Sequence, residues 1–208
     1  MNIILSSSEI SFFVEIIALC MYNKGIEQLQ RNDTMSLLTP TVAVRHVTDI
    51  SLGLLHELGT DAILLDVDNT LAPPASKTPY EGVQGWIDMV KESGIHIVIC
   101  SNNYKKRIKP FADSLGLDCV AMSLKPFPFG FNRAKRKLRE KPSSVLVVGD
   151  QIYTDVLGAN LAGMKSVLLL PRSEEHGWSI WLRRKMEKNK RKKIRLRNGD
   201  EGNVSKTR

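Results

Sequence analysis

The sequence is poor in cysteine and histidine, with three and four residues respectively over a length of 208 residues. An odd number of widely separated cysteines argues against a disulfide framework and fits a reducing cytosol. No Cys or His spacing matches a zinc site. With nine prolines and fourteen glycines, the chain is neither collagen-like nor of low complexity. A hydrophobic fraction of 42% beside 25% charged residues therefore indicates a globular protein with a sizeable core.

Long apolar runs are also missing. The run at residues 12–19 is interrupted by Glu15 and is shorter than the roughly 20 residues that span a bilayer. Lys24 is the first base, so the run lacks the charged leader of a secretory signal. We expect residues 1–36 to be an N-terminal extension, either an appended amphipathic segment or sequence upstream of the true start. The alternative starts are Met1, Met21 and Met35, of which the last is favoured.

The positive charge is confined to one segment. Residues 178–197 hold ten Lys or Arg and one acid, so the rest of the chain has a net charge of −1 within a total of +8. We expect residues 178–208 to form a basic C-terminal tail. Its aromatic residues, such as Trp178 and Trp181, lie beside bases, which is typical of a segment at an anionic membrane surface. An RNA partner and a solvated, solubilising end are the open alternatives.

Short apolar runs alternate with amphipathic segments in the region between these ends. The apolar runs predict strands at residues 62–65, 95–100, 119–122, 145–148 and 166–170. The amphipathic segments predict helices at residues 44–58, 83–90, 108–115, 131–141 and 156–162. This alternation predicts an α/β fold over residues 37–177. We expect a doubly wound, Rossmann-like parallel sheet of about five strands with helices on both faces.

Polar residues follow four of these strands. The strings are Asp66-Val67-Asp68-Asn69-Thr70, Ser101-Asn102-Asn103, Lys125-Pro126, and Gly149-Asp150 with Asp155 five residues later. Ligands of parallel sheets lie at the carboxyl ends of the strands, so we expect these side chains to converge. Gathered carboxylates need a cation, and oxygen ligands suit Mg²⁺. Lys125 and the Ser101 hydroxyl suit a phosphate, so the pattern predicts phosphoryl transfer.

In order, the four strings resemble the motifs of the haloacid dehalogenase superfamily of phosphatases. The stretch from Leu37 to about Glu187 is similar to subclass III-A, and within it to the bacterial relatives of the mitochondrial phosphatidylglycerophosphate phosphatase. This narrower resemblance depends on "LLDVDNTLAP", "SNN" and "GDQIYTDVLGAN".

The resemblance implies a role for each site residue. Asp66 would be the nucleophile that forms an aspartyl-phosphate. Asp68, two positions on and therefore expected on the same side of the strand end, would be the general acid and then the general base. The implied Mg²⁺ ligands are Asp66, Asp68 through its backbone carbonyl, Asp150 and the supporting Asp155. The implied phosphate-binding residues are Thr70, Ser101, Asn102 and Lys125.

Each residue also has an ordinary structural interpretation. Asp66 and Asp68 could be loop acids that accept turn N–H groups, and Ser101 or Asn102 could be a helix N-cap. Asp155 could favour the start of a helix through the dipole. Lys125 could be a surface lysine.

The gaps in which related phosphatases carry a cap domain, residues 71–79 and 123–130, are too short to hold one. An uncapped site favours a large substrate. The favoured hypothesis is a cytoplasmic, Mg²⁺-dependent phosphatase that converts phosphatidylglycerophosphate to phosphatidylglycerol, attached peripherally to the inner membrane face through residues 178–197. The second is the same chemistry on a soluble, protein or nucleic-acid phosphate. The third is a non-enzymatic RNA- or ribosome-binding module, against which the acid pair and the lack of an aromatic RNA-binding motif argue. We expect no DNA partner.

Overall fold

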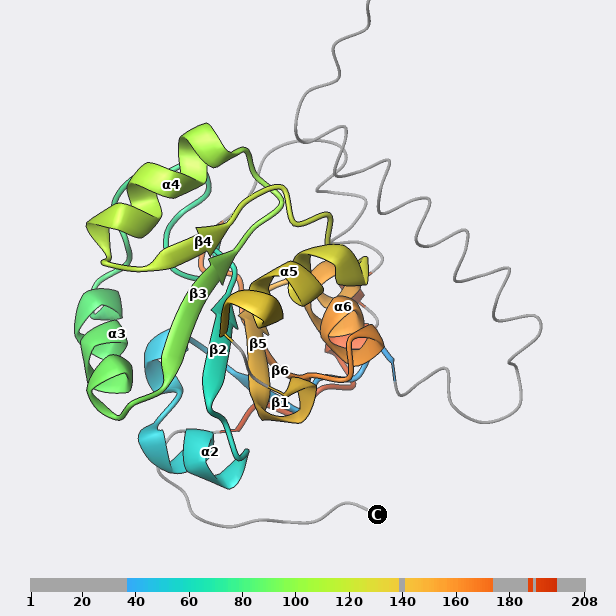
Figure 1. Ribbon diagram of the computed structural model, residues 1–208. Helices are drawn as coiled ribbons and strands as arrows, with labels where there is room; N and C mark the ends of the chain where they lie inside the picture. The colour runs from blue at the N-terminus through green and yellow to red at the C-terminus, as the bar shows by residue number, and fades with distance from the viewer. Residues whose placement is uncertain (1–36, 139–140, 174–186, 189, 198–208) are drawn as a thin grey trace, which may run out of the picture.

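A computed structural model describes residues 37–138, 141–173, 187, 188 and 190–197 of the chain (Figure 1). The predicted N-terminal extension, residues 1–36, and the aromatic part of the predicted tail, residues 178–186, lie outside this set. The described residues form one six-stranded parallel sheet in the order β1-β6-β5-β2-β3-β4. The strands are β1 (Val42–Val44), β2 (Ala62–Leu65), β3 (His96–Cys100), β4 (Asp118–Val120), β5 (Val145–Gly149) and β6 (Lys165–Leu169).

Helices cover both faces of the sheet, which confirms the predicted doubly wound α/β fold. Helices α3 (Val83–Glu92) and α4 (Lys105–Ser114) lie on one side, and α5 (Pro128–Leu138) and α6 (Leu157–Leu161) on the other (Figure 1). The remaining elements are η1 (Val47–Asp49), α2 (Leu52–Glu57), η2 (Pro142–Ser144) and the π-helical turn η3 (Ile152–Val156). Two predicted helix stops, Gly94 and Gly116, have φ angles of 85° and 64°, which glycine adopts without strain.

Apolar side chains are buried on both faces of the sheet, in three clusters, and the alternation of side chains along each strand decides which face a residue joins. In β2, Ile63 and Leu65 pack in the core that contains α3 and α4. Ala62 and Leu64 pack in the core that contains α5. All four residues are fully buried. Because both faces of the strand are covered, the sequence of β2 is apolar throughout instead of alternating.

The helix predicted over residues 44–58 is wrong in its first half. Residues 42–44 form β1, which pairs in parallel with β6 at the edge of the sheet. The chain then makes the short turn η1, and α2 begins only after Ser51, whose Oγ accepts a hydrogen bond from the Leu54 N–H at 3.2 Å. The apolar spacing that resembled one long helix arises because Val47 and Ile50 reach the same core as α2 from an irregular segment.

The loops at the carboxyl edge of the sheet are short, as predicted. Residues 66–82 join β2 to α3 and residues 121–127 join β4 to α5. All of these residues are described, and neither connection contains an additional domain. Among the described residues, no helix combines the length and the apolar character that crossing a membrane requires.

Candidate active site

Three carboxylates converge at the carboxyl edge of the sheet. Asp66 follows β2 and Asp150 follows β5, and these two strands are hydrogen-bonded neighbours. Asp155 belongs to η3, the turn that comes directly after β5. One carboxylate oxygen from each of the three acids lies within 4.8 Å of the others. The structure therefore brings Asp66 together with Asp150 and Asp155, which lie more than 80 positions further along the sequence.

The local fold after β5 directs Asp155 back toward the strand end. Its Oδ2 accepts a hydrogen bond from the Gln151 N–H at 3.1 Å, and its side chain is 2% exposed. A Cβ atom on Gly149 would overlap the Asp155 carboxylate. Glycine at position 149 therefore makes room for this acid.

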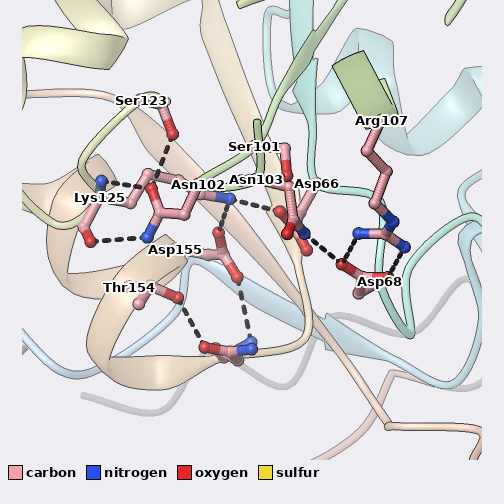
Figure 2. Close-up of polar contacts among 11 residues, drawn as sticks. Asp66, Asp68, Ser101, Asn102, Asn103, Arg107, Ser123, Lys125, Thr154 and Asp155 are labelled. Carbon is pink, nitrogen blue, oxygen red and sulfur yellow. Dashed lines mark hydrogen bonds and ion pairs between the residues drawn. The ribbon is translucent and has the colours of Figure 1, made fainter. Parts of the chain in front are cut away.

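Lys125 joins two of the three acids. Its Nζ lies 2.6 Å from Asp66 Oδ1 and 2.7 Å from Asp155 Oδ1 (Figure 2), and its side chain is 3% exposed. The interpretation of Lys125 as an ordinary surface lysine is therefore wrong. Asn102 positions this residue, since its Oδ1 accepts the Lys125 N–H at 2.7 Å and its Nδ2 donates to the Lys125 carbonyl at 3.0 Å. Ser123 donates its hydroxyl to the same Oδ1 at 2.8 Å.

Burial dominates the electrostatics of the cluster. It raises the pKa of Asp66 to about 8; the attraction of Lys125 opposes this rise, and the charges of Asp155, Asp150 and Asp68 add to it. Burial alone would lower the pKa of Lys125, but Asp155 and Asp66 together hold it above its usual value. Within the described part of the chain, the Lys125 ammonium group thus contacts two of the three carboxylates. This donor set of oxygen atoms with excess negative charge fits a divalent cation such as Mg²⁺.

Asp68 has a different environment from the other acids. Its Oδ1 accepts from Arg107 Nη2 at 2.5 Å and from the Ala75 N–H at 3.1 Å. Its Oδ2 accepts from Arg107 Nη1 at 2.8 Å and from Asn103 Nδ2 at 2.7 Å. Figure 2 shows the Asp68 carboxylate turned to Arg107, on the other side of Asp66 from Lys125.

Asp66 and Asp68 thus have different hydrogen-bond partners, Lys125 and Arg107 respectively. Strand β2 ends at Leu65, so the alternation of a strand does not extend to Asp68. The chain instead turns back on itself, with the Leu71 N–H bonded to the Val67 carbonyl at 2.9 Å. Asn69 has a φ of 56° in this turn, a conformation that asparagine tolerates better than most residues.

The other predicted phosphate-binding residues lie at the same edge. Ser101 is 1% exposed, and its Oγ accepts the Asn103 N–H at 3.2 Å. Neither Ser101 nor Asn102 caps α4, because its N-cap residue is Tyr104. The Oγ1 atom of Thr70 is buried and has no hydrogen-bond partner within the described part of the chain.

Sequence reasoning missed two pairs of contacts at this edge. The first pair is Arg107 with Asp68. Arg107 lies in the first turn of α4, where a base is unfavourable to the helix dipole, and this unusual position indicates that the side chain has an acidic partner. Glu187 and Arg191 belong to the predicted tail but pack on the domain. Glu187 Oε1 accepts the Ile152 N–H at 2.7 Å and its Oε2 accepts from Arg191 Nε at 2.9 Å. Arg191 also donates to the backbone carbonyl of Asp150.

A parallel sheet with an acid cluster and a buried lysine at its carboxyl edge is suited to hold a divalent cation beside a phosphate group. Residues 55–163 match the family of haloacid dehalogenase-like hydrolases. The chain is 33% identical over 149 residues to a Bacillus subtilis (strain 168) protein named "Probable phosphatase YqeG", covering 72% of this chain and 87% of that protein. The chain therefore belongs to the haloacid dehalogenase-like hydrolases and is a phosphatase, which sets aside the non-enzymatic alternative.

Two further proteins show shorter or more distant similarity. The glyceraldehyde 3-phosphate phosphatase of Pyrococcus furiosus is 42% identical over 43 residues, which are 21% of this chain and 18% of that protein. The cobalt-bound structure of deoxy-D-mannose-octulosonate 8-phosphate phosphatase from Haemophilus influenzae superposes with a TM-score of 0.43 and 12% identity, over 53% of this chain and 68% of that one.

Proposed function

We propose that this phosphatase belongs to subclass III-A, depends on Mg²⁺, forms an aspartyl-phosphate on Asp66 and dephosphorylates phosphatidylglycerophosphate. The observation that carries the proposal is the cluster of Asp66, Asp150 and Asp155, whose carboxylate oxygens lie within 4.8 Å of one another. Lys125 bridges two of these acids at 2.6 and 2.7 Å. A buried group of this charge has no evident structural purpose, because burying three acids with one lysine opposes folding.

In the proposed reaction, a carboxylate oxygen of Asp66 bonds to phosphorus while the bond from phosphorus to the alcohol oxygen breaks. Asp68 gives a proton to the departing alcohol. Water then attacks the phosphorus of the aspartyl-phosphate and Asp68 takes its proton. The acyl-phosphate bond breaks, inorganic phosphate leaves and Asp66 is restored. Lys125 holds Asp66 in place and offsets the charge of the entering phosphate.

Asp66, Asp150, Asp155 and the backbone carbonyl of Asp68 would hold the magnesium ion. When bound, Mg²⁺ supplies positive charge that offsets the repulsion between a carboxylate nucleophile and a phosphate dianion. The raised pKa of Asp66 is consistent with this need, because a nucleophile that holds a proton at neutral pH requires a cation to become ionised.

Two features support a lipid substrate. Among the described residues, the connections at residues 66–82 and 121–127 contain no cap domain, which suits approach of a headgroup on a membrane surface. Ten of the thirty bases of the chain lie in residues 178–197, and each base near an anionic surface contributes about 1 kcal/mol to attachment. We therefore place the enzyme on the cytoplasmic face of the membrane, with those bases of residues 178–197 that do not contact the domain toward the lipid.

The test measures phosphate release from phosphatidylcholine vesicles that contain phosphatidylglycerophosphate, with Mg²⁺ or with EDTA. We expect the wild type to release phosphate only with Mg²⁺ and Asp66→Asn to release none. Asp88→Asn, which changes an exposed acid of α3, is the matched control and keeps the wild-type rate. Equal release by Asp66→Asn and the wild type would refute the mechanism.

A second arm separates the substrate from the chemistry. Soluble phosphate esters and phosphopeptides are assayed with and without vesicles, using the same proteins. If they are hydrolysed with a higher kcat/KM than the lipid, the lipid assignment is wrong and the phosphatase chemistry stands.

A further inference from the structure

The Asp68 carboxylate has no room for a proton or a leaving group in the arrangement observed. Four donors approach its two oxygens: the two Nη atoms of Arg107, the Nδ2 of Asn103 and the N–H of Ala75, at 2.5 to 3.1 Å. An ionised carboxylate offers about four lone-pair sites, so this set occupies all of them. Asp68 must leave Arg107 before it can give a proton to an alcohol.

Releasing Asp68 would leave Arg107 without its counter-ion at the rim of the site. The Arg107 side chain is 30% exposed and that of Asp68 is 18% exposed, in contrast to the 3% of Lys125. Arg107 is therefore accessible to a ligand on the solvent side of the cluster. Its planar guanidinium binds a phosphate or a carboxylate through the same pair of parallel hydrogen bonds that it now gives to Asp68.

The helix that carries Arg107 also favours an anion at this place. The first turn of α4 contains Lys105, Lys106 and Arg107 and no acid, and its N-cap side chain makes no capping hydrogen bond. Bases at a helix N-terminus are unfavourable to the helix dipole, whereas an anion there is favourable. A second negative group of the substrate would offset this local excess of positive charge.

We propose that Arg107 binds a second anionic group of the substrate and that Asp68 occupies this position until the substrate arrives. The preferred substrate is thus a phosphomonoester with a phosphodiester or similar anion close to the scissile phosphate. When that anion pairs with Arg107, Asp68 is freed to serve as the proton donor. This inference rests on the proposed function, because it takes the acid and base role of Asp68 from there, and it extends that function to the selection of substrate.

The test compares two soluble substrates. One is the deacylated headgroup of phosphatidylglycerophosphate, which has a phosphomonoester and a phosphodiester, and the other is glycerol 3-phosphate, which has the monoester alone. We expect the wild type to prefer the headgroup in kcat/KM, and Arg107→Met to lower this preference about 10- to 100-fold, chiefly through KM. Arg107→Lys keeps the charge but not the paired hydrogen bonds, so its preference for the headgroup should lie between that of the wild type and that of Arg107→Met. Lys109→Met, on the same helix and exposed, is the control and keeps the preference.

The same variants are also assayed on intact phosphatidylglycerophosphate in vesicles. This experiment shows whether Arg107 recognises the phosphodiester in the lipid as well as in the soluble headgroup. Loss of preference in Arg107→Met for both the lipid and its soluble headgroup supports recognition of the diester itself. An unchanged ratio of kcat/KM between the headgroup and glycerol 3-phosphate in Arg107→Met would overturn the proposal, whether or not both values fall.

A binding measurement keeps this test independent of turnover. Calorimetric titration of the headgroup and of glycerol 3-phosphate into Asp66→Asn, with and without Arg107→Met, reports affinity alone. A selective loss of headgroup affinity in the double variant supports the anion site even if the chemistry on Asp66 is refuted. Equal affinities in the two proteins refute the anion site even if the phosphatase chemistry stands.

Discussion

Replacing Lys125 by methionine keeps the length of a buried side chain and removes its charge from the acid cluster. The ammonium group lies 2.6 Å from Asp66 and 2.7 Å from Asp155, at 3% exposure. Removing one partner of a buried ion pair costs about 3–5 kcal/mol, because the other charge is left without compensation. For a protein of this size, that loss corresponds to a fall of about 6–20 °C in Tm.

The loss should depend on both pH and Mg²⁺. Protonation of Asp66, whose pKa is about 8, removes its need for a counter-charge, so the difference from wild type should grow as the pH rises toward 8. A bound divalent cation replaces part of the missing charge and adds the free energy of its binding. Mg²⁺ should therefore raise the Tm of Lys125→Met by more than it raises that of the wild type.

The assay is thermal unfolding at pH 8, followed by circular dichroism, in EDTA and in Mg²⁺. Lys109→Met is the matched control, since Lys109 pairs with Asp113 on the solvent side of α4 at about half exposure, and its Tm should equal that of the wild type. If Lys125→Met in EDTA has the same Tm as the wild type, the charge balance described for the cluster is wrong. The same follows if Mg²⁺ stabilises both proteins equally.

Three further predictions concern the surroundings of the cluster. The pKa of Asp66 is raised from 3.8 to about 8, so the native state holds a proton that the unfolded chain releases. Its contribution to stability is present below pH 3.8 and lost as the pH rises through 8; urea unfolding in EDTA should show this decline in the wild type and not in Asp66→Asn. Gly149→Ala places a methyl group against the Asp155 carboxylate and should weaken Mg²⁺ binding about tenfold by calorimetry, and unchanged affinity would contradict the packing. Glu187→Gln removes the charge that Arg191 faces and should lower the free energy of unfolding by about 3 kcal/mol, whereas no change would show that this ion pair does not stabilise the domain.

The main strands and helices could be predicted because their signals are local. Strand β2 is a run of four fully buried apolar residues, and Gly94 and Gly116 end helices whose apolar faces repeat at helical spacing. The edge strand β1 has three residues and no such signal. It exists because residues 42–44 pair with residues 167–169, more than 120 positions away.

The sequence predicted which residues form the site, but not how all of their side chains are arranged. Motif order and strand ends identified Asp66, Asp150, Asp155 and Lys125, since the rule that parallel strands present their carboxyl ends together is independent of side-chain detail. The direction of the Asp68 carboxylate could not be predicted, because it depends on Arg107, which lies in the first turn of α4 and is distant in sequence. The contacts of Glu187 with the loop after β5 are likewise set by tertiary packing.

In the proposed mechanism, phosphorus bonds to Asp66 during turnover. The direct measurement is rapid acid quenching of the enzyme with substrate and Mg²⁺, followed by peptide mass mapping. We predict one phosphoryl group, labile to hydroxylamine, on the peptide that contains Asp66, and none when EDTA replaces Mg²⁺. A phosphoryl group on another residue, or steady turnover with no trapped phosphoryl group at any quench time, would contradict the account.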